Sequence, residues 1–227
     1  MWRKCVAAKR RRVSVTGSVT HVQTTIGGDF TTDISNPDPV TMTFSSNLTA
    51  GNLIVVTCVG SSGFSIPTFA VTDSLGNTYT SRKRDTNSPL AVEVFTCINC
   101  LGGSCTVTVT QTNGGLTGIS ASEYTGTGIS TIAIDGTSSN TGSSNSLTVT
   151  GPSVAAPPPR MLFSALGTLA NSGTIVGTSG WTQRVEQDGP SAAGIQTQDY
   201  LAAATTMSPS WTWTNVKTNV GVAVSFK

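Results

Sequence analysis

The sequence has little charge and only one histidine. Asp, Glu, Lys and Arg make up 11% of its 227 residues, against roughly 25% in typical globular domains. Ser, Thr, Gly and Asn fill that share, which favours an extracellular or virion protein over a cytosolic enzyme. A Ser-His-Asp triad would need His21 at its centre, and this residue lies in the N-terminal segment, outside the repeated part of the chain. We therefore expect a protein that is not an enzyme and has no cofactor.

Long apolar runs are missing as well. No stretch of about 18 apolar residues is present, so no membrane span is expected. The start, MWRKCVAAKRRRVSV, lacks the apolar core of a secretory signal peptide. If the protein works outside a cell, we expect release by lysis, by a non-classical route or after loss of a leader. The best helix-like piece, Tyr200–Thr205, is too short to stand alone.

Positive charge is concentrated at the N-terminus. Residues 1–12 hold six of the thirteen basic residues, so the remaining chain carries 7 − 11 = −4. This asymmetry is typical of a solvated terminus or of a tail that meets nucleic acid, a membrane surface or an acidic neighbouring subunit. The arm has no recognition motif, so any nucleic-acid contact would be weak and sequence-independent. The candidate contact residues are Arg3, Lys4, Lys9, Arg10, Arg11 and Arg12.

Strand patterns dominate the rest of the chain, and several occur twice. Short stretches rich in Val, Ile, Thr and aromatic residues are bounded by Gly, Asn, Ser and Pro. At offsets of 103 to 108 residues, LIVVTCV is echoed by MLFSALG, GNTYTSR by GWTQR, AVEVFTCI by GIQTQDYL, TVTVT by SWTWT and GISASEY by GVAVSF. The halves could be neighbouring domains. Because a lone amphipathic sheet must bury its apolar face, we favour one all-β fold, a jelly-roll-like antiparallel β-sandwich built from two weakly similar halves.

This reading divides the chain into three parts. Residues 1–12 are a basic arm, residues 13–47 an N-terminal extended segment, and residues 48–227 the sandwich. The sandwich has half-units at about 48–135 and 160–227, joined by a Ser/Asn/Gly/Pro-rich connection. The extended segment contains VSVTGSVTHVQTT, which alternates like an edge strand that could add to a neighbour's sheet.

Three pieces of the sandwich carry a family resemblance. LTAGNLIVV (Leu48–Val56), VTDSLGNTYT (Val71–Thr80) and VGVAVSFK (Val220–Lys227) resemble the β-sandwich modules of phage virion proteins, such as head decoration and tail appendage proteins, and of bacterial secreted or surface proteins. The resemblance covers about residues 48–227. It implies a structural or adhesive role without catalysis, and it supplies no catalytic residues to carry over.

The stretch CINCLGGSC is the one place where chemical groups cluster. The spacing of Cys97, Cys100 and Cys105 is like that of a zinc knuckle, but Thr110 stands where a fourth ligand would be needed. No Lys, Arg or His lies close in sequence to activate a thiol. Strand-like residues flank LGGS, so we expect a hairpin tip stiffened by a disulfide. The candidates for that bridge are Cys58, Cys97, Cys100 and Cys105, whose pairing the sequence leaves open among three connectivities.

The tryptophans are candidates for stacking on sugar rings. Trp211 and Trp213 lie two apart and so share one strand face, where a place in the core is favoured. Trp181 follows a glycine turn and is expected to be more exposed. The candidate glycan-stacking residues are Trp181, Trp211 and Trp213.

The acidic residues are scattered. Asp73 and Asn77 are explained by a turn better than by calcium, because EF-hand spacing is absent. Glu93 and Glu123 could form a glycosidase pair only if the fold brought them together.

Three hypotheses follow. The leading one is a non-enzymatic subunit of a phage-like virion, a capsid decoration or tail appendage protein that packs against copies of itself and other coat or tail subunits. The second is a carbohydrate-binding or adhesive module of a bacterial surface protein. The third is a coat protein that packages nucleic acid through its basic arm.

Overall fold

Three strands with both faces buried lie at the centre of the molecule. They are β3 (Leu53–Ser61), β6 (Leu90–Cys97) and β10 (Met161–Thr168), which are buried along almost their whole length. Runs of this kind are typical of strands covered on two sides, so each needs a layer above and a layer below.

The computed structural model describes residues 18–28, 39–61, 65–113, 116–126, 134–152, 161–169, 172–187, 193–201 and 207–226. Every regular element in these ranges is a strand. The described residues contain no helix that is long and apolar enough to cross a membrane. The prediction of an all-β, jelly-roll-like antiparallel sandwich built from two weakly similar halves is confirmed. The remaining strands are β1 (Val19–Gly27), β2 (Val40–Thr43), β4 (Thr68–Asp73), β5 (Thr80–Asn87), β7 (Thr106–Thr112), β8 (Leu116–Gly126), β9 (Ile134–Thr148), β11 (Val176–Gly177), β12 (Thr182–Gln187), β13 (Gly194–Leu201) and β14 (Ser210–Phe226).

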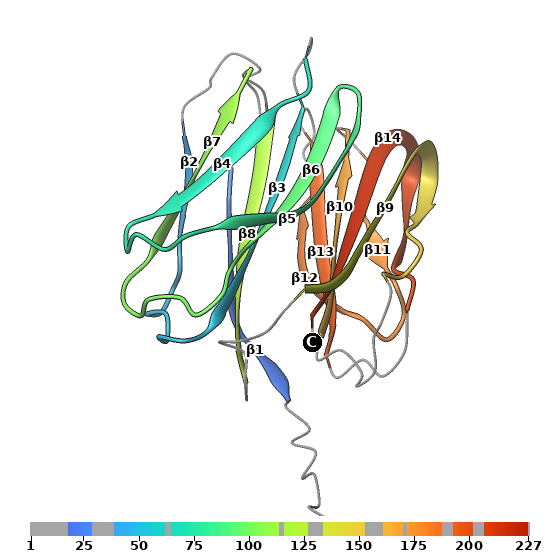
Figure 1. The fold of residues 1–227 in the computed structure, drawn as a ribbon. Helices are drawn as coiled ribbons and strands as arrows, with labels where there is room; N and C mark the ends of the chain where they lie inside the picture. The colour runs from blue at the N-terminus through green and yellow to red at the C-terminus, as the bar shows by residue number, and fades with distance from the viewer. Residues whose placement is uncertain are drawn as a thin grey trace, which may run out of the picture.

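The strands form three sheets that lie in layers (Figure 1). Sheet 1 has the order β1-β8-β3-β6-β5, and sheet 2 has the order β11-β14-β10-β13-β12, with β9 also paired to β14. A short sheet, β2-β7-β4, covers the outer face of sheet 1. Sheets 1 and 2 face each other across the main core, where Val55 and Val92 share one apolar cluster with Phe163 and Val222.

Two smaller cores lie outside the main one. Between sheet 1 and the short sheet, Ile54 and Phe95 cluster with Val107 and four cysteines. On the outer face of sheet 2, Leu166 clusters with Trp211. Each half therefore has its own second layer, in addition to the interface that joins the two halves.

The second half repeats the first strand for strand. Sheet 1 runs β8-β3-β6-β5, and sheet 2 runs β14-β10-β13-β12 in the same sequence order. The start of β14 corresponds to β7: it pairs with β11 and with the end of β9, and β7 pairs in the same way with β4 and β2. The end of β14 corresponds to β8: it pairs with the start of β9 and with β10, and β8 pairs in the same way with β1 and β3. Strands β1 and β2 thus belong to the repeat, although their sequences show no echo in β9.

The interpretation of CINCLGGSC as a hairpin tip is wrong. β6 pairs with β3 and β5 in sheet 1, whereas β7 pairs with β2 and β4 in the short sheet. The segment between them is therefore a crossover between two layers. Main-chain bonds hold it: Cys100 N donates to Asn52 O at 2.9 Å, and Gly51 N donates to Cys100 O at 2.9 Å. Strand-like residues on both sides of a Gly-Gly pair fit a crossover as well as they fit a hairpin.

Candidate functional site: the cleft between β1 and β12

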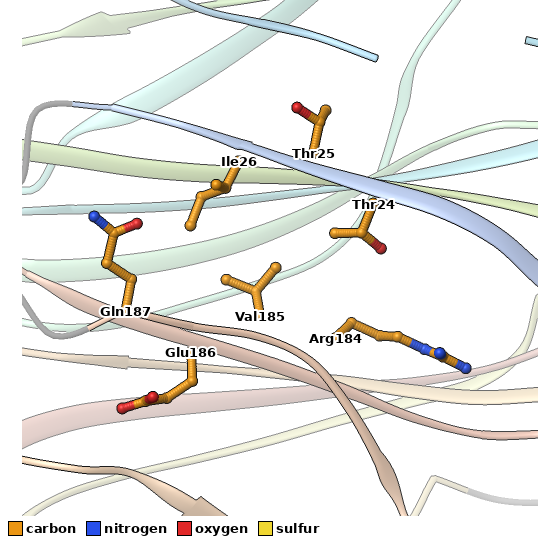
Figure 2. A pocket seen from close by; sticks show the side chains of 7 residues that line it. All are labelled: Thr24, Thr25, Ile26, Arg184, Val185, Glu186 and Gln187. Carbon is orange, nitrogen blue, oxygen red and sulfur yellow. The ribbon is translucent and has the colours of Figure 1, made fainter. Parts of the chain in front are cut away.

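The two long rims of the central sandwich differ. At one rim β5 lies against β9 and β14, and Asn87 Nδ2 donates to Gly142 O at 2.8 Å and to Asn219 O at 3.4 Å. At the other rim β1 and β12 diverge and leave a cleft of about 470 Å³ (Figure 2). We call these the sealed rim and the open rim. The cleft is lined by Thr24, Thr25, Ile26, Arg184, Val185, Glu186 and Gln187.

A bulge in β1 decides which of its side chains reach the cleft. The pairing of β1 with β8 shifts register between His21 and Gln23. In Figure 2, Thr24 and Ile26 point from β1 toward β12, and Val185 points back toward them. On the other face of β1, Thr25 Oγ1 donates to Thr43 O at 3.0 Å and so ties β1 to the short sheet. The cleft therefore has a small apolar floor with hydroxyl, amide and charged groups around it.

A buried polar tie crosses the main core behind the cleft. Arg184 binds Asp199 through two bonds, from Nε to Oδ2 at 2.7 Å and from its second terminal nitrogen to Oδ1 at 3.0 Å. Tyr124 of sheet 1 donates its hydroxyl to Asp199 Oδ2 of sheet 2 at 2.7 Å. Asp199 and Tyr124 are fully buried. A buried carboxylate is expensive unless it is paired and hydrogen-bonded, and these three bonds satisfy it.

The pKa values of the tie follow from this arrangement. Burial acts to lower the pKa of Arg184, but the hydrogen bonds and charge of Asp199 outweigh it and raise that pKa. Burial, followed by the charge of Asp199, raises the pKa of the Tyr124 hydroxyl well above its ordinary value. At neutral pH the guanidinium is therefore charged and the phenol is neutral, which keeps both as hydrogen-bond donors to Asp199.

His21 lies at the edge of this tie. Its Nε2 is 2.7 Å from Thr24 Oγ1, which is 2.8 Å from Ser122 Oγ, and its ring meets that of Tyr124 edge-on at 5.5 Å. Burial and then the charge of Arg184 lower the pKa of His21. The His21–Thr24 distance would also suit a general base and its nucleophile. The Thr24 hydroxyl, however, is shared with Ser122 of β8, so the arrangement fastens β1 to β8.

The four candidate disulfide cysteines are free thiols in the structure, so the predicted bridge is not formed. Cys100 Sγ donates to Thr49 O at 3.4 Å, and Cys105 Sγ donates to Asp73 Oδ2 at 3.5 Å. The two sulfurs thus have separate partners. All four cysteines are buried in the core between sheet 1 and the short sheet.

Burial also makes these thiols poor nucleophiles. It raises the pKa of Cys97 to about 11, with a further contribution from the charge of Asp73, and raises those of Cys100 and Cys105 to about 12. The thiolate is the reactive form and the metal ligand. Within the described ranges, no three His, Cys, Asp or Glu side chains are placed to hold a metal ion.

The candidate glycan-stacking residues Trp181, Trp211 and Trp213 are all buried. The expectation that Trp181 is exposed is wrong: it is 8% exposed and packs with Leu162 and Tyr200. The favoured core position of Trp211 and Trp213 is confirmed, since both lie in the outer core of sheet 2. A sugar ring stacks on an exposed aromatic face, and these three rings offer none.

The scattered acids have structural partners. Asp73 accepts bonds from the main chain of Leu75 and Asn77 and from the Tyr79 hydroxyl, as the turn interpretation requires. Glu93 and Glu123 lie opposite Cys58 and Ile54 of β3. These β3 positions are four residues apart, or about 13 Å along the strand. That exceeds the roughly 5–9.5 Å between the two carboxyl groups of a glycosidase.

The six basic residues of the N-terminal arm, Arg3 to Arg12, lie outside the described residues. The residues that form the tie were missed from the sequence. One signal was available: Asp199 lies in GIQTQDYL, where alternation with Ile195 places a carboxylate on an inward face.

Comparison with known proteins adds no relative. No protein-family model matches the chain, and neither a curated protein nor a solved structure matches it significantly.

Proposed function

We propose that this chain is a non-enzymatic structural subunit of a phage-like virion, a capsid decoration or tail appendage protein that acts through subunit packing. The observation that carries the proposal is the open rim, where the edge strand β1, which has no Asp, Glu, Lys or Arg, lies beside the cleft. Such an edge offers main-chain groups to another strand. The resemblance of residues 48–227 to virion modules supplies the setting.

The inner construction supports the same role. Titratable groups that could have formed a reactive site bind structural partners, as Asp199 binds Arg184 and Glu123 accepts bonds from Asn52 and Gln23. One core joins sheet 1 to sheet 2, a second joins sheet 1 to the short sheet, and a third packs the outer face of sheet 2. A coat or tail subunit needs a stiff body with sites for neighbours, and we infer that its partners are copies of itself and other coat or tail subunits.

The proposal is tested on particles from a lysed culture of the source. Particles are separated on a density gradient, and the intact chain is quantified relative to the main coat protein by peptide mass spectrometry. We expect a constant copy number per particle that survives a high-salt wash, because strand and apolar packing depend little on salt.

Two outcomes contradict the proposal. The chain could be found only in the soluble fraction. It could also leave the particle in moderate salt and bind naked nucleic acid through residues 1–12, which would favour the packaging hypothesis because phosphate contacts weaken steeply with salt.

A further inference from the structure

Three rim strands of sheets 1 and 2, namely β1, β5 and β12, differ in how their edges are protected. Natural sheets protect free edges with charged residues, prolines and bulges. β5 has three basic residues, one acid and a bulge at Arg82, and β12 has Arg184, Glu186 and a bulge. β1 has a bulge as well, but its sequence, VTHVQTTIG, contains no Asp, Glu, Lys or Arg. Within the described residues, β1 pairs with β8 alone.

β1 also has apolar side chains at its surface. Val22 is 44% exposed and Ile26 is 39% exposed. Exposed large apolar side chains number five in the described ranges, and two of them fall on these nine residues. Ile26 points into the cleft (Figure 2). At the sealed rim, by contrast, Asn87 binds main-chain oxygens of β9 and β14.

We propose that the free edge of β1 pairs with β1 of a second copy of this chain. The pairing is antiparallel and two-fold symmetric, and it joins the two copies of sheet 1 into one continuous sheet. It rests on the proposed function, because it names the self-contact of a subunit that works by packing. The charge pattern selects a second copy: antiparallel self-pairing of an uncharged strand sets no like charges opposite each other, which would be destabilising. Self-pairing of β5 would crowd its three basic residues.

The bulge fixes the register of this contact. It leaves residues 23–27 as the regular part of β1, so the pairing centres on Thr25. Ile26 of one copy then lies opposite Thr24 of the other, on the side of the cleft. The cleft of about 470 Å³ gives the added side chains room, and the contact covers Ile26, which a soluble monomer would leave exposed.

The test compares matched lysine variants of the full chain by sedimentation velocity over a concentration series. Ile26→Lys adds a gatekeeper charge to the β1 edge. Val216→Lys adds the same charge at a side chain that is 68% exposed on β14. We expect the unchanged chain and Val216→Lys to dimerise alike, and Ile26→Lys to weaken dimerisation by at least tenfold. Thermal melts show whether each variant is folded.

Amide hydrogen exchange gives a second readout that needs no variant. Residues 23–27 should gain protection as the unchanged chain is concentrated. A chain that stays monomeric throughout overturns the inference, and so does a dimer that Ile26→Lys leaves intact while these amides exchange freely. If the chain is found in particles but Ile26→Lys leaves the dimer unaffected, this contact alone is overturned. An Ile26-dependent dimer that never enters particles would overturn the proposed function instead.

Discussion

The two halves share a strand order but use different side chains at equivalent positions. In both, an arginine occupies the bulge of a rim strand: Arg82 in β5 and Arg184 in β12. The register places Thr96 in the first half where Asp199 lies in the second. Arg82 Nε donates to Thr96 Oγ1 at 2.6 Å, and burial lowers the pKa of Arg82. The pKa of Arg184 is raised instead. A repeated backbone thus carries a bond from an arginine to a hydroxyl in one half and a buried ion pair in the other.

The same comparison explains why the central interface has its polar tie on one side. Tyr124 of sheet 1 reaches Asp199. At the equivalent place of sheet 2 the register puts Phe226, which has no hydroxyl. The outer cores differ as well, since Val107 and Val109 of β7 correspond to Trp211 and Trp213 of β14. A duplicated fold can therefore diverge in its contacts while its strand order stays fixed.

The largest expected effect is in the outer core of the second half. Trp211→Ala should lower the free energy of unfolding by about 4–5 kcal/mol, because it leaves a cavity and removes the bond from the indole N–H to buried Gln196. Val107→Ala, at the matching position, should lower it by about 2 kcal/mol. Urea denaturation of both variants checks this, and equal losses would show that the two outer cores contribute alike.

The polar tie should come second. Asp199→Asn leaves the Arg184 guanidinium without its charge partner and should lower the free energy of unfolding by about 3 kcal/mol. Thr96→Val, which removes the hydroxyl that accepts from Arg82 at the equivalent place, should lower it by about 1 kcal/mol. The triple change Arg184→Met, Asp199→Leu and Tyr124→Phe should recover most of the loss, since well-packed apolar replacements of buried ion pairs are often neutral. Failure of that recovery in denaturation curves would mean that the tie does more than satisfy its own charges.

Acid should destabilise the turn that Asp73 holds in the first half more than it destabilises the equivalent turn of the second half. Burial acts to raise the pKa of Asp73, but its bonds from Asn77, Tyr79 and Leu75 outweigh burial and lower that pKa. A carboxylate with a lowered pKa stabilises the folded state above its ordinary pKa, and this stabilisation is lost as pH falls through the lowered value. Asp73→Asn should therefore cost about 1–2 kcal/mol at neutral pH and flatten the acid side of a stability-versus-pH curve.

The second half offers a control for this prediction. Gly177 takes the place of Asp73 in the register, and the hydroxyl of Thr178 holds the turn by accepting from Ser210 N at 2.6 Å. Thr178→Val should destabilise the protein by a similar amount at every acidic and neutral pH. A pH-dependent loss for Thr178→Val would contradict the assignment of the acid sensitivity to Asp73.

The smallest effect is expected at the sealed rim. Asn87→Ala removes two bonds to main-chain oxygens of β9 and β14 and should lower the free energy of unfolding by about 1 kcal/mol or less. Amide exchange in β9 should rise while exchange in β1 stays the same. If β9 amides were unchanged, the rim would be closed by the packing of β5 rather than by Asn87.

The sequence predicted more of the fold than of the site. The echoes beginning at Leu53 and Met161 were enough for two similar halves and an all-β sandwich, because strand patterns and turns are local signals. The layer that receives a strand is not a local property, which is why the strand-like flanks of CINCLGGSC predict a hairpin where the structure has a crossover. The tie of Tyr124, Arg184 and Asp199 joins strands from both halves, so no spacing in the sequence reveals it. The cleft lies between β1 and β12 at the open rim, and the separation of these two strands depends on the packing of whole sheets.

The most direct test of the account compares the two rims in one sample. Amide hydrogen exchange of the full chain is followed at low and at high protein concentration. The account predicts that residues 23–27 of β1, at the open rim, gain protection at high concentration, while β9 at the sealed rim keeps the same exchange rates. Equal behaviour of β1 and β9, or a β1 edge whose exchange never depends on concentration, would contradict it.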